Sequence, residues 1–314
     1  MPTPTLQRPP DPITQSPTMW DTIAQHIQAT TQQPFKASPP RSIGGGCINR
    51  GYCLSNGQGQ QYFVKTNAPT LVEMFAAEAL GLQQMHQARA IKVPEPICWG
   101  STEQVSYLVL EWLDIGGGSS AQAWATLGRQ LAQLHRKAIS DRGFGWDRNN
   151  TIGSTPQIND WTADWVEFWS EKRIAYQLKL GRRNGGRFPQ GQELLDRIPD
   201  LLAGHDPEPS LVHGDLWGGN GSILRSGEPV IFDPAAYYGD REVDLAMTEL
   251  FGGFSPSFYQ GYQQEWPLAA GYDRRKPLYN LYHILNHFNL FGGSYEAQAN
   301  GLIDRLLRSK AMGL

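Results

Sequence analysis

Apolar residues recur along the chain with two different spacings, and each spacing predicts a different kind of element. Over residues 19–33, Trp20, Ile23 and Ile27 recur at helical intervals after an acidic residue in the first turn, where negative charge suits the positive end of a helix. Residues 41–67 instead alternate apolar and polar side chains around the turn SNGQGQ. That pattern predicts two strands joined by the turn.

The next segment, residues 70–88, predicts a strong helix with one charged residue in its apolar stripe. Glu78 lies seven residues after Leu71 and four before Leu82. A buried carboxylate requires a cationic partner, and Lys65 at the end of the preceding strand is the nearest candidate. The alternative is that Glu78 lies at the edge of the stripe and reaches water.

The remaining pattern predicts a second, mainly helical lobe. An apolar strand, VSYLVLEW, stops at the segment DIGGGSS, and helical spacing follows in AQAWATLGRQLAQLHRKA, in an aromatic helix from near Asp160 and in LYNLYHILNHFNLFGG. The first eighteen residues are rich in proline, which predicts a mobile leader. We therefore expect a leader at 1–18, an N-lobe at 19–113 and a C-lobe at 114–314, in an α+β fold.

Composition narrows the class of protein. Hydrophobic residues make up 40% of the 314, charged residues 18%, and the net charge is −3, which gives no reason to expect nucleic acid as a partner. No apolar run approaches the roughly 18 residues that span a bilayer, and the N-terminus lacks the order of a signal peptide. We therefore expect a cytoplasmic protein that makes no membrane contact.

The three cysteines do not form a metal-binding or disulfide pattern, because their spacing contains no CxxC pair. Cys47 lies inside the glycine-rich turn, where it could act as a redox handle that links two chains. The other interpretation is a small residue tolerated in a loop. Without such a link we expect a monomer.

The segment LVHGDLWGGN, residues 211–220, holds the candidate chemistry. Residues 222–233 follow it and predict a hairpin, so Asn220 just before the first strand and Asp233 just after the second should lie side by side. Two oxygen ligands at one place suit Mg²⁺, which retains waters or substrate phosphate oxygens for its other positions. Asp215, five residues before Asn220, could reach a substrate hydroxyl from a glycine-bordered loop.

These residues together offer the parts that phosphoryl transfer requires. A carboxylate accepts the proton of the attacking hydroxyl, a metal neutralises phosphate charge and a lysine holds the nucleotide. The order of a glycine-rich turn, Lys65 on a strand, Glu78 on the next helix, HGDxxxxN and Asp233 is that of the protein-kinase-like fold. An isolated HGD triplet could merely cap a turn, but the five-residue interval and the hairpin argue against that interpretation.

Two further acidic residues, Asp240 and Asp244 in GDREVDLA, could be read as additional metal ligands. We favour structural roles for both. Asp240 is expected near a helix start, and Asp244 is expected to brace the catalytic loop.

The chain resembles the fructosamine kinase family, the ketosamine-3-kinases, in HGDLWGGN, FDPAAYYGDREVDLAMTELFGGF, FGWDRNNTIGSTPQIN and LYHILNHFNLFGG. The resemblance covers nearly everything from about residue 20 onward. It implies ATP-dependent phosphorylation of the sugar 3-hydroxyl of a ketosamine, such as a fructosamine or ribulosamine adduct, with loss of the adduct from the amine or protein. HGD followed by Asn is shared with aminoglycoside and choline kinases, so phosphorylation of such a small molecule is the alternative.

The resemblance also implies a role for each candidate residue. Asp215 would be the base, Asn220 and Asp233 the metal ligands, and Lys65, with its partner Glu78, the contact to the phosphates. The nucleotide would also be bound by the turn glycines Gly44, Gly45 and Gly46 and, beside adenine, by Glu111 and Leu113. Trp217 and His287 would line the sugar cleft. The cofactors implied are ATP and Mg²⁺. The sequence has DPA where protein kinases have DFG and no APE segment, which argues against an activation-loop switch.

Overall fold

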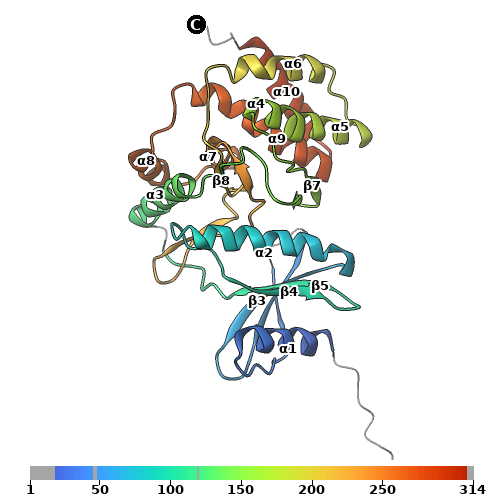
Figure 1. Ribbon diagram of the computed structural model, residues 1–314, viewed down its shortest axis with the longest axis vertical. Helices are drawn as coiled ribbons and strands as arrows, with labels where there is room; N and C mark the ends of the chain where they lie inside the picture. The colour runs from blue at the N-terminus through green and yellow to red at the C-terminus, as the bar shows by residue number, and fades with distance from the viewer. Residues whose placement is uncertain (1–17, 45–47, 119, 310–314) are drawn as a thin grey trace, which may run out of the picture.

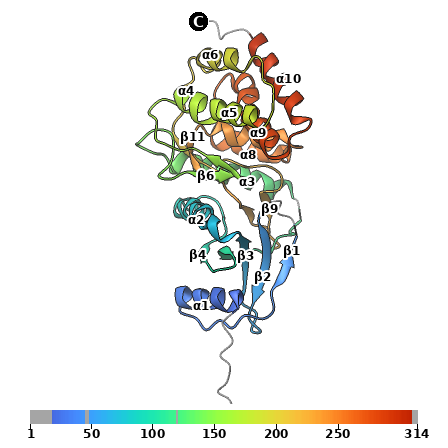
Figure 2. The same cartoon turned by 90° about the vertical axis from the view of Figure 1, so that its right-hand side faces the viewer.

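A computed structural model describes residues 18–44, 48–118 and 120–309 of the chain. Two lobes lie one above the other, with α1 (Met19–Thr31) and α10 (Tyr295–Arg308) at opposite ends of the molecule (Figures 1 and 2). Helix α2 (Val72–Gln87) lies between the sheet of the first lobe and the helices of the second (Figure 1). The α+β class predicted from the sequence is confirmed.

The N-lobe is built on one antiparallel sheet in the order β1-β2-β3-β5-β4. Its strands are β1 (Arg41–Ile43), β2 (Arg50–Ser55), β3 (Gln61–Asn67), β4 (Pro96–Ser101) and β5 (Ser106–Glu111). The predicted hairpin is β2 with β3, joined by the SNGQGQ turn. Strands β1 and β4 were not anticipated from the sequence.

Strand β5 is buried on both faces because a helix covers each side of the sheet. Tyr107 and Val109 pack in the cluster that contains α1, and Leu108 and Leu110 pack in the cluster that contains α2. Alternate residues of a strand point to opposite faces, so α1 and α2 lie on opposite sides. This explains why VSYLVLEW reads as an unbroken apolar run.

The C-lobe is mainly helical. Its helices are α3 (Ala121–Lys137), α4 (Trp165–Phe168), α5 (Tyr176–Arg183), α6 (Gly191–Leu201), α7 (Glu242–Leu250), α8 (Pro256–Glu265), α9 (Tyr272–Phe291) and α10. Three short antiparallel strand pairs accompany them: the hairpin of β6 (Asn150–Ile152) with β7 (Thr155–Gln157), the hairpin of β9 (Gly221–Ile223) with β10 (Pro229–Ile231), and the pair of β8 (Ser210–Val212) with β11 (Tyr237–Gly239), which encloses β9 and β10 in sequence. A 3₁₀ turn at Pro69–Leu71 and a π-helical segment at Trp169–Ala175 complete the elements.

Most of the aromatic stretch after residue 160 forms the centre of the C-lobe core, as predicted, but Trp161, which was expected to share this face, is only partly buried and lies outside the core cluster. Trp165, Phe168 and Trp169 are buried, and Trp165 and Trp169 both pack against Tyr279 of α9. The helix begins at Trp165, however, and not near residue 160 as expected. The side chain of Asp164 accepts a hydrogen bond of 2.7 Å from the Glu167 amide and caps that first turn.

The glycine-rich linker between the lobes packs closely on the β9–β10 hairpin. A Cβ atom at Gly117 would lie 1.9 Å from the carbonyl oxygen of Leu224, so only glycine fits there. The amide of Gly117 also donates a hydrogen bond of 3.0 Å to the carbonyl of Ile223. The linker is therefore tied to the hairpin that carries the candidate metal ligands.

Candidate active site

The loop from Val212 to Asn220 carries the proposed base, and its path depends on one glycine. Gly214 has a φ of +79°, in the left-handed region that favours glycine. A Cβ atom at this position would lie 2.2 Å from the carbonyl oxygen of Ala235. The loop and the segment that follows Asp233 are therefore in direct backbone contact.

The side chain of Asp244 binds the backbone of this loop, as the sequence predicted. Its carboxylate accepts hydrogen bonds from the amides of His213 at 2.7 Å and Gly214 at 2.8 Å, and it also contacts His135 Nε2 at 3.1 Å. Burial alone would raise the pKa of Asp244, but these bonds lower it below its ordinary value. The carboxylate stays charged and fixes the loop.

His213 is fixed in one tautomer beside the base. Its Nε2 lies 2.9 Å from the carbonyl oxygen of Phe232, which can only accept, so Nε2 carries the proton. Nδ1 is then free to accept from the amide of Asp215 at 3.3 Å. Burial lowers the pKa of His213, which keeps the ring neutral.

Asp215 lies in an environment that makes it a stronger base than an exposed carboxylate. Burial, together with the negative charges of Asp233 and Asp244, raises the pKa of Asp215 well above its ordinary value, and a hydrogen bond from Asn220 opposes this. A base with a raised pKa accepts a proton more readily near neutral pH, provided that it remains ionised when substrate and metal are bound.

Asn220 and Asp233 lie side by side, as the predicted hairpin requires. Strands β9 and β10 pair in register, and the amide of Phe232 donates to the carbonyl of Asn220 at 3.0 Å. Asn220 Nδ2 donates to the carbonyl of Asp215 at 2.8 Å, so Oδ1 is left without a partner in the described part of the chain. The Asp233 side chain is 46% exposed. An amide oxygen next to an accessible carboxylate fits a divalent metal that takes oxygen ligands.

The ion pair between Lys65 and Glu78 is confirmed, with 2.6 Å between Nζ and Oε1. Lys65 Nζ also contacts a carboxylate oxygen of Asp233, a contact that the sequence did not suggest. Burial would lower the pKa of Lys65, but the two carboxylates raise it above its ordinary value. Burial raises the pKa of Glu78 to about 7, against the attraction of Lys65. The ammonium group is thus held charged between helix α2 and the hairpin.

The candidate nucleotide residues of the N-lobe are described in part. Glu111 ends β5; its amide donates to the carbonyl of Glu95 at 2.8 Å, and its carboxylate binds Lys92 at 2.6 Å. The amide of Leu113 has no partner among the residues that the structure describes. Gly44 is open, with no atom within 4 Å of a Cβ placed there. Gly45, Gly46 and Cys47 lie outside the described residues, whereas Cys53 and Cys98 are buried and free.

Trp217 and His287 lie in different settings. The Trp217 ring is 42% exposed and lies over Gly219, where a Cβ atom would come within 2.3 Å of it. His287 of α9 donates from Nδ1 to the carbonyl of His283 at 2.8 Å, which leaves Nε2 as an acceptor. Its ring packs against Phe251 at 4.8 Å between centroids. Among the described residues no hydrogen bond or ring contact joins His287 to the catalytic loop.

Sequence reasoning missed two residues that contact this site. Gln157 and Asn150, on the β6–β7 hairpin, donate to the backbone carbonyls of Ala235 and Ala236. In the sequence these two residues were noticeable only as part of the segment NNTIGSTPQIN, which resembles the fructosamine kinase family but suggested no physical role for either side chain.

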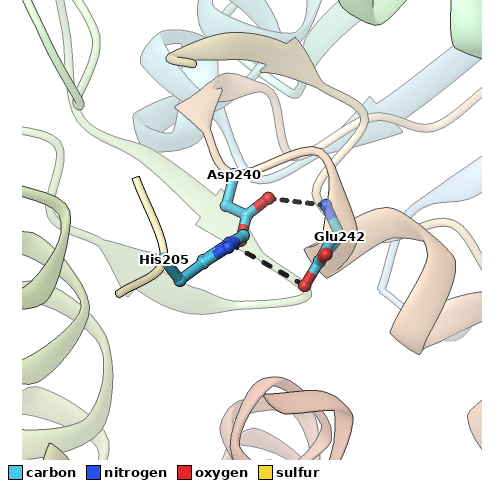
Figure 3. A group of neighbouring side chains, drawn as sticks. All are labelled: His205, Asp240 and Glu242. Carbon is cyan, nitrogen blue, oxygen red and sulfur yellow. Dashed lines mark hydrogen bonds and ion pairs between the residues drawn. The ribbon is translucent and has the colours of Figure 1, made fainter. Parts of the chain in front are cut away.

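One group of three potential metal ligands lies away from this site in the described part of the chain. His205, Asp240 and Glu242 have donor atoms within 4.8 Å of one another (Figure 3). Arg275 already binds both Glu242 oxygens at 2.7 Å, and Asp240 accepts from Tyr279 at 2.5 Å and from the Glu242 amide at 3.0 Å. These hydrogen bonds and the ion pair occupy the carboxylate oxygens and hold the start of α7 in place. We therefore infer that the group has a structural role, as predicted for Asp240.

Comparison with solved structures identifies the fold class of this chain. A crystal structure from Haemophilus somnus, provisionally named as a fructosamine-3-kinase, superposes with a TM-score of 0.86 at 31% identity over 92% of this chain and 98% of that one. A thermostable mutant of an aminoglycoside phosphotransferase superposes with a TM-score of 0.58 at 18% identity, over 92% of this chain and 100% of that one, which shows the shared fold alone. The fold is protein-kinase-like, as predicted.

Sequence comparison gives the family. The model of the fructosamine kinase family matches residues 19–309. The chain is 56% identical over 293 residues to a probable ketoamine kinase of Synechocystis sp., covering 93% of this chain and 98% of that protein. It is 46% identical over 271 residues to a chloroplastic protein-ribulosamine 3-kinase of Arabidopsis thaliana, covering 85% and 82%. The chain belongs to the fructosamine kinase family. Among its described helices, none is long and apolar enough to cross a membrane.

Proposed function

We propose that this protein is an ATP- and Mg²⁺-dependent ketosamine kinase that phosphorylates the sugar 3-hydroxyl of fructosamine or ribulosamine adducts. The observation that carries the proposal is that three groups converge within one family-matched site. They are the partly buried carboxylate of Asp215, the amide oxygen of Asn220, which has no partner among the described residues, and the lysine-bound carboxylate of Asp233. These are the groups that phosphoryl transfer to an alcohol needs.

Asp215 is the proposed base in this reaction. Its raised pKa suits it to accept the proton of the 3-hydroxyl as that oxygen attacks the γ-phosphorus of ATP, while the bond from this phosphorus to the β–γ bridging oxygen breaks and ADP leaves. His213 and Asp244 do not touch the substrate in this scheme; they hold the loop through its backbone amides. The base therefore acts from a fixed position, and its alignment lowers the entropic cost of the reaction.

Asn220 Oδ1 and the Asp233 carboxylate would hold Mg²⁺. When bound, the ion neutralises negative charge on the β- and γ-phosphates. Lys65 would then exchange its contact with Asp233 for the phosphates, while Glu78 keeps the ammonium group in place. The ion pair with Glu78 is thus a means of orienting Lys65.

The nucleotide base and the sugar are assigned to two further places. The Leu113 amide, which has no partner among the described residues, is the proposed donor to adenine. The backbone amide of Glu111 already donates to Glu95, so of the Glu111 backbone groups only the carbonyl could contact adenine. The exposed face of Trp217 is the proposed platform for the apolar face of the sugar. His287 Nε2 is an available acceptor for a sugar hydroxyl.

A substrate panel tests the proposal. The protein is incubated with Mg-ATP and, separately, with a fructosamine, a ribulosamine, an aminoglycoside and choline, and products are identified by phosphorus NMR. We expect a 3-phosphate on the ketosamines and no phosphorylated antibiotic or choline. Phosphorylation of another alcohol, with none on either ketosamine, would contradict the proposal.

The panel also decides the alternative function. An aminoglycoside- or choline-type phosphotransferase has the same fold, but the likeness of this chain to the aminoglycoside enzyme is at 18% identity and supports the fold only. The ketoamine and ribulosamine kinases match at 56% and 46% identity. Comparing the fructosamine and ribulosamine assays further shows which of the two sugars is the better substrate.

A redox-linked dimer through Cys47 is tested separately, by nonreducing electrophoresis after peroxide treatment.

A further inference from the structure

The segment that follows Asp233 is bound on one side by two buried amide side chains. Gln157 Nε2 donates to the carbonyl of Ala235 at 3.0 Å, and Asn150 Nδ2 donates to the carbonyl of Ala236 at 2.8 Å. Gln157 is 1% exposed and Asn150 is 9% exposed. Both come from the β6–β7 hairpin, which contacts helix α2 and lies at the junction of the lobes.

The catalytic loop binds the same segment from the other side. The amide of Ala235 donates to the carbonyl of His213 at 2.9 Å, and the carbonyl of Phe232 accepts from His213 Nε2 at 2.9 Å. The amide of Phe232 is bound to Asn220. The backbone is therefore hydrogen-bonded at Phe232, one residue before Asp233, and at Ala235, two residues after it.

Asp233 needs such support because its backbone is in a disfavoured conformation. Its φ is +60°, in the left-handed region that residues with a Cβ seldom adopt. A conformation of this kind persists only where the surroundings fix it, and it is common at functional sites. The hydrogen bonds to Ala235 and Ala236 fix the chain on the C-terminal side.

The two amides are themselves held in one orientation. The hydroxyl of Tyr282 donates to Gln157 Oε1 at 2.7 Å, and the second hydrogen of Gln157 Nε2 reaches Asn150 Oδ1 at 2.9 Å. Asn159 donates to the same Asn150 oxygen at 2.8 Å. Rotating either amide would place oxygen against oxygen, so the donors point at the two carbonyls.

We propose that Gln157 and Asn150 are positioning residues that hold Asp233 in the conformation in which it binds the metal. The inference rests on the proposed role of Asp233 as a ligand. Outer residues that orient a ligand commonly change metal affinity by about 10- to 100-fold when they are replaced. Because the amides act on the backbone and not on the substrate, their loss should weaken metal binding more than it lowers the rate at saturating metal.

The test measures Mn²⁺ binding to the full-length protein in the presence of ADP, by electron paramagnetic resonance. Gln157→Met keeps the length of the side chain but removes the donor. We expect its Mn²⁺ dissociation constant to rise about tenfold or more. In ketosamine assays the half-saturating Mg²⁺ concentration should rise likewise, with kcat at saturating Mg²⁺ close to that of the wild type.

Two controls separate positioning from general stability. Ser154→Ala changes an exposed residue in the turn of the same hairpin and should bind Mn²⁺ normally. Ile303→Val destabilises the core at α10 without touching the network and should also bind normally. If Gln157→Met does not fold, Tyr282→Phe removes only the hydroxyl that orients Gln157 and should weaken Mn²⁺ binding in the same direction.

Two results would overturn the inference, and they are distinguishable. Normal Mn²⁺ binding by the wild type and by folded Gln157→Met would show that the amides do not position Asp233, while the proposed function stands. Absence of ADP-dependent Mn²⁺ binding by the wild type would remove Asp233 from the ligand role and the proposed function with it.

Discussion

The side-chain amide of Asn220 donates a hydrogen bond of 2.8 Å to the backbone carbonyl of Asp215, five residues earlier. This bond closes the catalytic loop and leaves Asn220 Oδ1 as the group that can bind a metal. One side chain therefore links the proposed base to the proposed metal site. A substitution at this position should disturb both.

We accordingly predict that Asn220→Ala loses metal-dependent activity. The variant lacks a ligand and the tether to Asp215, and we expect kcat/KM to fall by about 10²-fold or more. Steady-state kinetics with varied Mg²⁺ measure the effect, and raising Mg²⁺ should restore activity only in part. Full recovery at high Mg²⁺ would mean that the tether to Asp215 contributes nothing.

A second prediction concerns the base itself. Asp215→Asn preserves the size of the side chain but cannot accept the proton, so turnover should fall by about 10²- to 10⁴-fold. Binding of Mg-ATP, measured by calorimetry, should remain close to that of the wild type because Asp215 is not a proposed ligand. Near-normal turnover would remove Asp215 from the base role.

The hairpin and the ion pair were accessible from sequence because their signals are local. Asn220 and Asp233 flank two short alternating strands around a turn, and the ends of a hairpin must meet. Glu78 drew attention because a carboxylate in an apolar stripe needs a partner. The pattern left open whether that partner was Lys65 or water, and the contact of 2.6 Å resolves it.

The positions of Gln157 and Asn150 could not be predicted in this way. Their partners, the carbonyls of Ala235 and Ala236, lie 78 and 86 residues away in sequence. Amide side chains in a short, proline-containing hairpin look like surface residues, because their burial arises only when distant segments pack. The second contact of Lys65, with Asp233, was missed for the same reason, since it joins residues 168 apart.

A third prediction tests the contact between Gly214 and Ala235. In Gly214→Ala the new Cβ would lie 2.2 Å from the Ala235 carbonyl at a φ of +79°, so the loop must move. The left-handed conformation alone costs about 1–2 kcal/mol for a residue with a Cβ. We expect a lower melting temperature and a large loss of kcat.

Gly218 offers a matched control in the same loop. No atom lies within 4 Å of a Cβ placed at Gly218, and its φ is outside the left-handed region. Gly218→Ala should therefore keep its melting temperature within a few degrees of the wild type. If both variants lose the same stability, the effect at Gly214 cannot be due to its close contact with the Ala235 carbonyl. The loop would then require the flexibility of each of its glycines.

A fourth prediction follows from His283, which is buried in α9. Burial lowers the pKa of His283 to about 3, whereas an unfolded histidine has a pKa of about 6.5. Below pH 6.5 the unfolded chain takes up a proton that the folded chain does not, so the free energy of unfolding falls as pH decreases. At pH 5.5 the loss from this residue is about 1.4 kcal/mol relative to pH 7.5.

Urea unfolding at pH 7.5, 6.5 and 5.5 measures this dependence. His283→Gln cannot titrate, so its stability should fall less steeply with decreasing pH than that of the wild type. Some dependence should remain, because burial also lowers the pKa of His213 and of His287. His86→Gln, at an exposed position in the last turn of α2, serves as the control and should follow the wild type. The contrary result is that the free energy of unfolding of His283→Gln depends on pH as steeply as that of the wild type. His283 would then be protonated in the folded protein, with its positive charge stabilised by a carboxylate such as that of Asp244.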